Sequence, residues 1–253
     1  LNIGQCYKPY FLNFLIQNDM IKISDTEYFS NDKTIRFLNM DCNEFMKGCK
    51  ENEFDLIHND PPYGLGKSVV NSGGRFKRYE NKNGNWDLET PTKDHFDLCF
   101  KVSKNQIIWG GNYFDLPANK HFIIWDKMQP QGISFAMGEY AWGSFDKVAQ
   151  IYSERTQGQE DRFHPTQKPI ELYKWILYNY TNPTDTILDC FGGSMSNAIA
   201  CHMKRRKLTI IELDVDYFKS ALKRFEIYER QVEDIAEFGF AKNKLESINP
   251  TLF

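Results

Sequence analysis

The sequence predicts an α/β protein built on a doubly wound, mostly parallel sheet. Phe54–Asn59 is an apolar run that ends abruptly in Asp60 and two prolines, as expected of a buried strand whose ladder hydrogen bonds stop there. Thr186–Leu188 is a short apolar run followed by a glycine-bearing turn, Asp189–Ser194, and a helix start near Asn197. Strand, turn and helix in this order form the repeating unit of doubly wound sheets.

The first half of the chain alternates strand patterns with amphipathic helix patterns. Residues 1–30 have no clear period, so we expect them only to pack at an edge. Helices are expected from about Cys42 to Lys50, and from Thr90–Asp94 onward. The expected strands are Thr34–Leu38, Asn105–Trp109, His121–Trp125 and Lys147–Tyr152. Trp109 and Trp125 could stack on bases, but core packing is the simpler interpretation.

The second half continues the alternation. Pro169 introduces a helix over Ile170–Tyr180, and a strand is expected at Leu208–Leu213. Asp214 then caps a long amphipathic helix. The tail 225–253 carries six acidic and three basic residues, a net charge of −3, so we expect it to pack on the protein or on a second subunit, as in a homodimer, and not on DNA.

Composition fits one domain spanning residues 1–253. The chain has 253 residues, 41% of them hydrophobic, which is enough for a sizeable core. We expect no secretory leader and no membrane span, and therefore a soluble cytoplasmic protein. No pair has C-x-x-C spacing and the five histidines form no ligand cluster, so neither zinc nor disulfides are expected at the six cysteines, which are Cys6, Cys42, Cys49, Cys99, Cys190 and Cys201.

Asp60-Pro61-Pro62-Tyr63 places an acid and an aromatic ring at the carboxyl end of a strand, the edge where doubly wound sheets bind ligands. An exocyclic amine of a nucleobase suits these groups, because the Asp60 carboxylate and the Pro61 carbonyl could each accept one N–H. Tyr63 would offer a face for base stacking, worth roughly 1–3 kcal/mol. A turn with a capping Asp60 and a half-buried Tyr63 is the simpler alternative.

A second set of residues indicates a nucleotide-type cradle. Glu212 stands at the tip of the next strand, some 20 residues after the glycine turn, where an acid commonly binds a ribose diol. Asp41 follows another strand on the same edge, and it could either contact such a ligand or cap the following helix. Asn112, in a Gly-Gly-Asn turn, is open to the same two interpretations.

Four motifs together resemble a known family. Asp60-Pro-Pro-Tyr63, His164-Pro-Thr-Gln-Lys-Pro169, Asp189-x-Phe-x-Gly-Ser194 and Glu212 resemble the motifs of S-adenosylmethionine-dependent DNA amino-methyltransferases. Their order, with the catalytic motif before the cofactor motif, is similar to the circularly permuted β class, and other segments resemble a compact, phage-like branch. The resemblance runs from about Thr34 to Phe225.

The resemblance implies a fold and a cofactor. The fold would be a Rossmann-like class I methyltransferase, a permuted seven-stranded sheet in which Thr186–Asp189 lies beside Phe54–Asp60. The cofactor would be S-adenosylmethionine, converted to S-adenosylhomocysteine, with no metal. The catalytic residues implied are Asp60, Pro61, Pro62 and Tyr63, and the cofactor-binding residues are Asp41, Asp60, Thr166, Lys168, Asp189, Phe191, Gly192, Gly193, Ser194 and Glu212.

Binding to double-stranded DNA must rest on local patches, because the net charge is −3. Residues 64–92 are expected to form a mobile basic loop that contacts phosphates. In the family, target recognition lies between the catalytic and cofactor halves, here residues 127–163, with Gln129, Gln131, Arg155, Gln157, Gln159 and Arg162 as candidate readers. The DNA-binding residues expected in the loop are Lys67, Arg75, Lys77, Arg78 and Lys82.

The implied activity is site-specific methylation of adenine N6 in DNA, as in restriction-modification systems, with the base flipped out of the duplex. An Asp at the first clamp position favours adenine; cytosine N4 fits the same geometry. An RNA or protein-glutamine N-methyltransferase is a further alternative. Met195-Ser196 replaces the family's Gly-Thr and could narrow the approach of the ligand, which leaves a catalytically degenerate DNA-binding relative as another alternative.

Overall fold

The computed structural model describes residues 20–65, 89–130, 132, 136–155 and 167–248. Ten strands form one sheet in the order β1-β2-β3-β10-β9-β4-β5-β7-β6-β8. The strands are β1 Ile21–Lys22, β2 Glu27–Phe29, β3 Ile35–Leu38, β4 Phe54–Asn59, β5 Ser103–Trp109, β6 Phe122–Asp126, β7 Gly138–Gly143, β8 Gln150–Ser153, β9 Thr186–Asp189 and β10 Lys207–Ile211.

Seven central strands, from β3 to β6 in the sheet order, form the predicted doubly wound core. Neighbours from β3 through β10, β9 and β4 to β5 are parallel, and β7 runs antiparallel between β5 and β6. The β1–β2 hairpin extends one edge antiparallel to β3, and β8 extends the other. The predicted fold class is therefore confirmed, and the segment 20–30 packs at an edge as expected.

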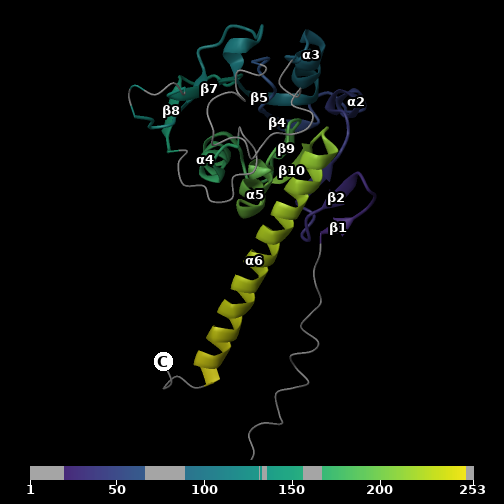
Figure 1. Ribbon diagram of the computed structural model, residues 1–253, viewed down its shortest axis with the longest axis vertical. Helices are drawn as coiled ribbons and strands as arrows, with labels where there is room; N and C mark the ends of the chain where they lie inside the picture. Colours follow the sequence, from purple (N-terminus) through teal and green to yellow (C-terminus); the bar gives the residue numbers. More distant parts are fainter. Residues whose placement is uncertain (1–19, 66–88, 131, 133–135, 156–166, 249–253) are drawn as a thin grey trace, which may run out of the picture.

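Helices cover both faces of the sheet (Figure 1). On one face lie α4 (Ile170–Tyr180), α5 (Ser196–Met203) and the start of α6 (Val215–Ile248), and on the other lie α2 (Cys42–Lys47) and α3 (Lys93–Val102). Consecutive strand residues alternate between the two cores, as the pleat requires. Ile187 packs under α4–α6 and Leu188 packs under α2 and α3.

The two motif-bearing segments lie side by side. β9 pairs with β4 in parallel, with Leu56 opposite Ile187 and Ile57 opposite Leu188, although these strands are more than a hundred positions apart. Both strands end at the same edge, so Asp60 and the glycine turn after Asp189 emerge next to each other. This juxtaposition, predicted from the sequence, is what creates the site.

β7 corrects the expectation for residues 127–163. These residues were expected to form a recognition insertion, yet Gly138–Gly143 is a central strand, hydrogen-bonded to β5 and to β6. Its aromatic sequence gave no clear alternation, because the strand is covered only in its second half, Ala141–Gly143. The 3-10 helix η3 (Gly111–Tyr113) precedes residues 127–163 in the chain, and it contains Asn112, which is exposed.

Several element ends differ from the sequence expectation; β10, for example, ends at Ile211 and not at Leu213. α2 ends at Lys47, where the backbone N–H of Gly48 donates to the Phe45 carbonyl and that of Cys49 donates to the Met46 carbonyl. β8 begins at Gln150, after a turn in which the ammonium of Lys147 binds the Asn179 carbonyl. α6 continues to Ile248, so most of the expected tail 225–253 belongs to this helix.

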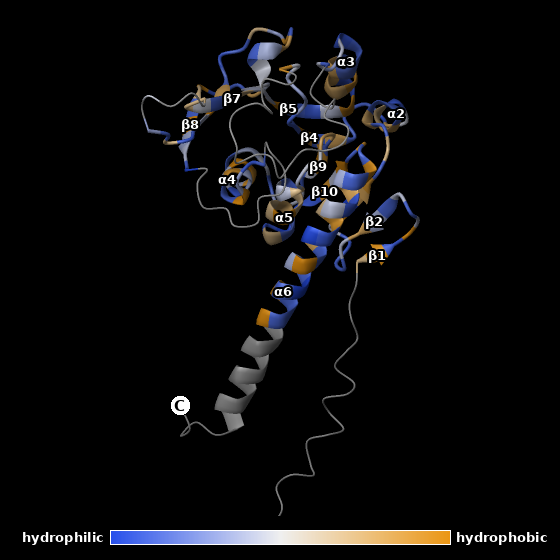
Figure 2. Ribbon diagram, in the orientation of Figure 1, coloured by the Kyte–Doolittle hydropathy of each residue, from blue (hydrophilic) through white to orange (hydrophobic). Residues whose placement is uncertain are grey.

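α6 leaves the body of the protein. Figure 1 shows its second half running away from the sheet, and Figure 2 shows hydrophilic residues interspersed with isolated hydrophobic ones along the coloured part of the helix. Within the expected tail, Glu229 accepts from the backbone N–H of Asn31 at 2.8 Å, and the Glu233 carboxylate accepts from the Asn31 side chain at 2.9 Å. The first turns of the tail therefore pack on the protein, beside the β2–β3 turn. Across the described ranges, no helix combines the length and apolar character that a bilayer crossing requires.

Candidate active site

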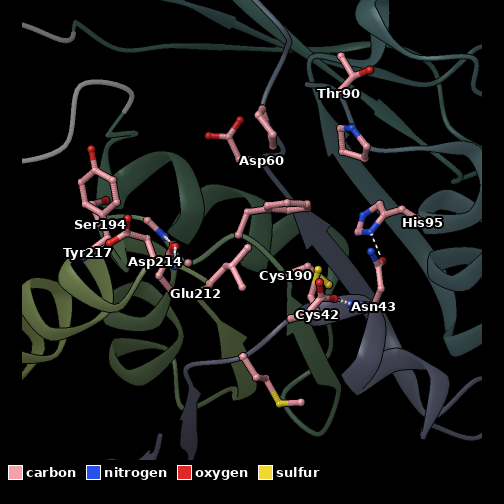
Figure 3. A pocket seen from close by; sticks show the side chains of 18 of the residues that line it. Cys42, Asn43, Asp60, Thr90, His95, Cys190, Ser194, Glu212, Asp214 and Tyr217 are labelled. Carbon is pink, nitrogen blue, oxygen red and sulfur yellow. Dashed lines mark hydrogen bonds between the residues drawn. The ribbon is translucent and has the colours of Figure 1, made fainter. Parts of the chain in front are cut away.

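A cavity of about 610 Å³ lies at the carboxyl ends of β3, β4, β9 and β10. Figure 3 shows Asp60 between two groups of lining residues, with Ser194, Glu212 and Tyr217 on one side and Thr90 and His95 on the other. The lining set joins both halves of the chain and includes, from the predicted residues, Asp41, Asp60, Pro62, Lys168, Phe191, Gly192, Gly193, Ser194 and Glu212.

Both oxygens of the Asp60 carboxylate are engaged. The hydroxyl of Tyr63 donates to Oδ1 at 2.7 Å, and the ammonium of Lys168 donates to Oδ2 at 2.5 Å. Burial and the neighbouring Asp60 carboxylate raise the pKa of Tyr63 well above its usual value, so the hydroxyl keeps its proton and remains a donor. Tyr63 thus orients the acid as well as offering a ring.

The Tyr63 ring is held by its surroundings. It stacks on Tyr113, with ring centroids 5.0 Å apart and planes 16° from parallel. Gly110, in the left-handed region at φ +68°, lies so close to the ring that a Cβ there would overlap it. Pro61 is buried and Pro62 is half-buried, as expected for a strand that stops at this point.

Lys168 occupies a position that the sequence did not predict. The resemblance implied a cofactor-binding role, and that role stays a prediction; in the structure Lys168 contacts two carboxylates of the protein, Asp60 at 2.5 Å and Glu139 at 3.2 Å. Glu139 was missed, because β7 was not recognised as a strand. Since β7 is antiparallel to β5, its first residues lie at the active edge, and a lone acid at the start of an aromatic strand is the signal that could have identified Glu139.

The glycine turn is fixed by hydrogen bonds. Gly193 N–H donates to Glu212 Oε2 at 2.7 Å, and Gly192 N–H donates to the Ile211 carbonyl at 2.8 Å. Arg224 of α6 donates to the Ser194 carbonyl at 2.7 Å. A Cβ at Gly192 would stand 3.2 Å from Ile211 O, so the turn lies tightly against β10. Burial raises the pKa of Glu212, although backbone N–H groups partly offset this effect.

Asp189 shapes the turn from behind. It is 3% exposed, it does not line the cavity, and it accepts from Phe191 N–H at 3.0 Å and from the Asn197 amide at 2.9 Å. Burial raises the pKa of Asp189 to about 7, despite these two donors. Its expected direct contact with the cofactor stays a prediction, while its structural part in the turn is plain.

The raised pKa of Asp189 predicts a pH-dependent contribution to stability. A buried acid whose pKa rises from 3.8 to about 7 keeps its proton in the folded state while the unfolded chain loses it, so its contribution falls as pH rises through that window. Asp189→Asn removes this dependence. Between pH 4 and pH 7 the unfolding free energy of the native protein, relative to Asp189→Asn, should fall by a few kcal/mol, at about 1.4 per unit. Urea unfolding at both pH values measures the difference; an equal gap at both would contradict it.

Met195 points away from the cavity. Its side chain is fully buried in the core beneath α4–α6 and it does not line the cavity, so it does not narrow the ligand's approach as the sequence suggested. Its backbone is left-handed, with φ 55°, which a glycine adopts without strain. Met195, at the position where the family turn has Gly, therefore strains the backbone and adds a buried hydrophobic side chain to the core.

Met195→Gly is expected to lower stability and leave cofactor binding nearly unchanged. Losing a buried methionine costs about 2–5 kcal/mol, and relieving the left-handed strain returns only about 1 kcal/mol. Met195→Ala is the matched control, because it removes the same contacts and keeps the strain. Thermal unfolding should rank the native protein above Met195→Gly and Met195→Ala lowest, with S-adenosylmethionine affinity by calorimetry within about threefold for folded variants. A tenfold tighter affinity in Met195→Gly would contradict the placement.

On the side of the cavity away from Ser194, Glu212 and Tyr217, the lining comes from α2, α3 and the residues directly after β9. Asp41 caps α2, accepting from the Asn43 and Glu44 N–H groups at 2.7 and 3.2 Å, and it also lines the cavity, so its two interpretations are compatible. His95 bonds Asn43 at 2.8 Å and packs on Phe191, with centroids 5.3 Å apart. His95 and Asn43 were missed, because sequence periodicity marks them only as helix positions.

Ten of the predicted site residues lie outside the described residues. They are Thr166, the five basic-loop residues Lys67, Arg75, Lys77, Arg78 and Lys82, and the candidate readers Gln131, Gln157, Gln159 and Arg162. Trp109 and Trp125 are buried, 0% and 2% exposed, and pack edge to face, so core packing accounts for both. In the described part of the chain, no group of His, Cys, Asp or Glu has the arrangement of a metal site.

Comparison with known proteins identifies the family. A family model described as DNA methylase, N6_N4_Mtase, matches residues 106–223. A relative named "Putative methylase YubD", from Escherichia coli (strain K12), is 30% identical over 214 residues, covering 78% of this chain and 93% of YubD. The chain belongs to the N6/N4 DNA methylase family. DNA adenine methyltransferase YhdJ of the same strain is 24% identical over 259 residues, covering 80% of this chain and 85% of YhdJ.

A solved structure supports the fold. The PvuII DNA methyltransferase (cytosine-N4-specific) aligns with a TM-score of 0.50 at 15% identity, covering 78% of this chain and 89% of that protein. At this identity the likeness concerns the fold alone. Membership of the family makes this chain an S-adenosylmethionine-dependent DNA amino-methyltransferase, with S-adenosylmethionine as its cofactor.

The cavity of this DNA methylase fits such a cofactor. Its volume of about 610 Å³ is within the usual range for small-molecule sites. An acid at the tip of the next strand supplies acceptors and the Phe191 ring supplies an apolar wall for an adenosyl group, beside a glycine turn that lets a ligand approach the backbone closely. Asp41 adds a further carboxylate at the same edge.

Proposed function

We propose that this methylase transfers a methyl group from S-adenosylmethionine to the exocyclic N6 of an adenine flipped out of double-stranded DNA, acting in the cytoplasm where that DNA lies. The observation that carries the proposal is the placement of Asp60, at the end of β4, on the same cavity as the glycine turn after β9. The cofactor supplies a methyl already activated on a sulfonium.

The chain's own residues would hold the amine. The Asp60 carboxylate and the Pro61 carbonyl accept its two N–H groups, which frees the nitrogen lone pair for attack. The base stacks on Tyr63 and, if it uses the face now covered by Tyr113, it takes the place of that ring. Flipping costs a few kcal/mol, which stacking and phosphate contacts must offset.

The cofactor would lie across the remaining predicted residues. The proposal assigns the ribose hydroxyls to Glu212 and the methionine end to the glycine turn, Thr166 and the start of α4. The Lys168 ammonium is already paired with the Asp60 carboxylate. A cofactor carboxylate could therefore bind Lys168 only as an additional partner of this ion pair. Asp189 would act through the turn that it shapes.

Adenine is favoured over cytosine by Asp at the first clamp position and by the name of YhdJ, a DNA adenine methyltransferase. Pro62, just before the expected basic loop 64–92, and Glu89 and Thr90, near its end, line the cavity, which supports a proposal of phosphate contacts near the target. Because β7 belongs to the sheet, the recognition residues are proposed to lie in the remaining parts of 127–163.

Incubation with labelled S-adenosylmethionine and unmethylated DNA, followed by digestion to nucleosides and mass analysis, tests the proposal. We expect label in N6-methyl-2′-deoxyadenosine. Label in N4-methyl-2′-deoxycytidine would correct the base, and label in neither, or label only with RNA or protein added, would overturn the assignment.

A further inference from the structure

Four charged side chains form a continuous row that ends at the catalytic acid. The Lys127 ammonium contacts Glu139 Oε1, and Glu139 Oε2 lies 3.2 Å from the Lys168 ammonium. Lys168 reaches Asp60 Oδ2 at 2.5 Å, and Tyr63 donates to Asp60 Oδ1 at 2.7 Å. Positive and negative groups alternate along the row, so each charge is matched by its neighbours.

Lys168 is the most deeply buried member. Its side chain is 1% exposed and its ammonium lies 4.9 Å from the centre of the Trp109 ring. Burial alone would lower the pKa of Lys168, but the Asp60 and Glu139 carboxylates outweigh that effect and raise it, so Lys168 stays charged. A permanently charged, buried ammonium must keep a carboxylate partner.

This arrangement sets up a competition at Asp60. Under the proposed function, the target amine must donate an N–H to the Asp60 carboxylate, whose Oδ2 already receives a short hydrogen bond from Lys168. If the Lys168 ammonium bound only Asp60, its positive charge would weaken the Asp60 carboxylate as an acceptor for the amine. It would also fix the carboxylate in its present orientation. Glu139 offers the same ammonium a second acceptor within 3.2 Å.

We propose that Glu139 is a positioning residue for methyl transfer: it takes up Lys168 as the target amine bonds Asp60, so that Asp60 remains a strong, correctly aimed acceptor. This inference rests on the proposed function. Glu139 acts as a fixed negative charge and exchanges no proton, because Lys168 and Lys127 outweigh its burial and lower the pKa of Glu139 to about 2.

A double-mutant cycle on the full-length protein tests the role. Glu139→Gln should lower kcat by about 10- to 100-fold, the usual effect of losing a hydrogen bond to a charged group, with KM for DNA changed much less. In a Lys168→Met background the competing cation is absent, so the same Glu139→Gln change should cost less than about threefold. Glu139→Asp, which keeps the charge, should restore at least part of the loss.

Controls separate positioning from simple structural support. Glu27→Gln removes a half-buried glutamate that pairs with Arg36 outside the cavity, and it should leave kcat unchanged. Thermal unfolding of every variant reports folding, and Glu139→Asp keeps the test valid if Glu139→Gln is poorly folded. An equal penalty for Glu139→Gln in both backgrounds, or no penalty in either, would overturn the inference.

The proposed function fails separately. Retained methylation by an Asp60→Ala variant would show that Asp60 does not hold the target amine, which would contradict the proposed function. An inactive Asp60→Ala variant together with a fully active Glu139→Gln variant would contradict only the proposed role of Glu139.

Discussion

Asp60→Ala is expected to abolish methyl transfer and to leave S-adenosylmethionine binding largely intact. The variant removes the proposed acceptor of the target amine, and losing one preorganised hydrogen-bonding group of this kind typically costs about 100- to 1000-fold in kcat. Cofactor binding should persist, because Glu212 and the glycine turn form their own hydrogen bonds without Asp60. Single-turnover methylation and calorimetric titration of the cofactor measure the two effects.

Asp60→Asn is the matched control for the charge. The amide keeps the volume of the side chain and an oxygen that can accept from Tyr63, but it no longer neutralises Lys168. It should therefore be nearly as inactive as Asp60→Ala. Turnover within tenfold of the native enzyme in either variant would mean that another group holds the amine.

Gly110→Ala is expected to reduce kcat by about 100-fold, because small misplacements of reacting groups carry costs of that order. A Cβ at position 110 would overlap three atoms of the Tyr63 ring, with Cζ at 2.8 Å. The ring would have to shift, and its hydroxyl holds Asp60 at 2.7 Å, so the acid would move with it. Steady-state kinetics on DNA measure the loss, and the affinity for the cofactor should change little.

Gly132→Ala is the control for backbone strain. Gly132 also has a positive φ, +86°, and no atom of the described residues lies within 4 Å of a Cβ placed there. Alanine at position 132 would therefore cost about 1 kcal/mol for its left-handed backbone, with no steric clash. If the two variants lose the same activity, strain and not displacement of Tyr63 is the cause, and the proposed coupling of Gly110 to Asp60 is wrong.

The elements that build the site could be predicted because each has a local signal. β4 ends where Pro61 and Pro62 can no longer donate ladder bonds, and β9 is followed by glycines that only a tight turn needs. Parallel pairing then follows from the alternation of strands and helices. These signals depend only on neighbouring residues, so they can be recognised without knowledge of the tertiary fold.

The direction of single side chains could not be predicted in the same way. Met195 is on the turn in sequence, yet its left-handed backbone turns the side chain into the core. Lys168 is paired by Asp60 and by Glu139, residues 108 and 29 positions away, and β7 brings Glu139 there only because it runs antiparallel. Such contacts depend on where distant segments meet, which periodicity and motif spacing do not specify.

A crystal structure with S-adenosylmethionine bound tests the central claim most directly. The claim predicts the cofactor in the 610 Å³ cavity, with the ribose hydroxyls on Glu212 and the sulfonium methyl directed toward Asp60. A cofactor bound outside this cavity, or one whose methyl points away from Asp60, would contradict it.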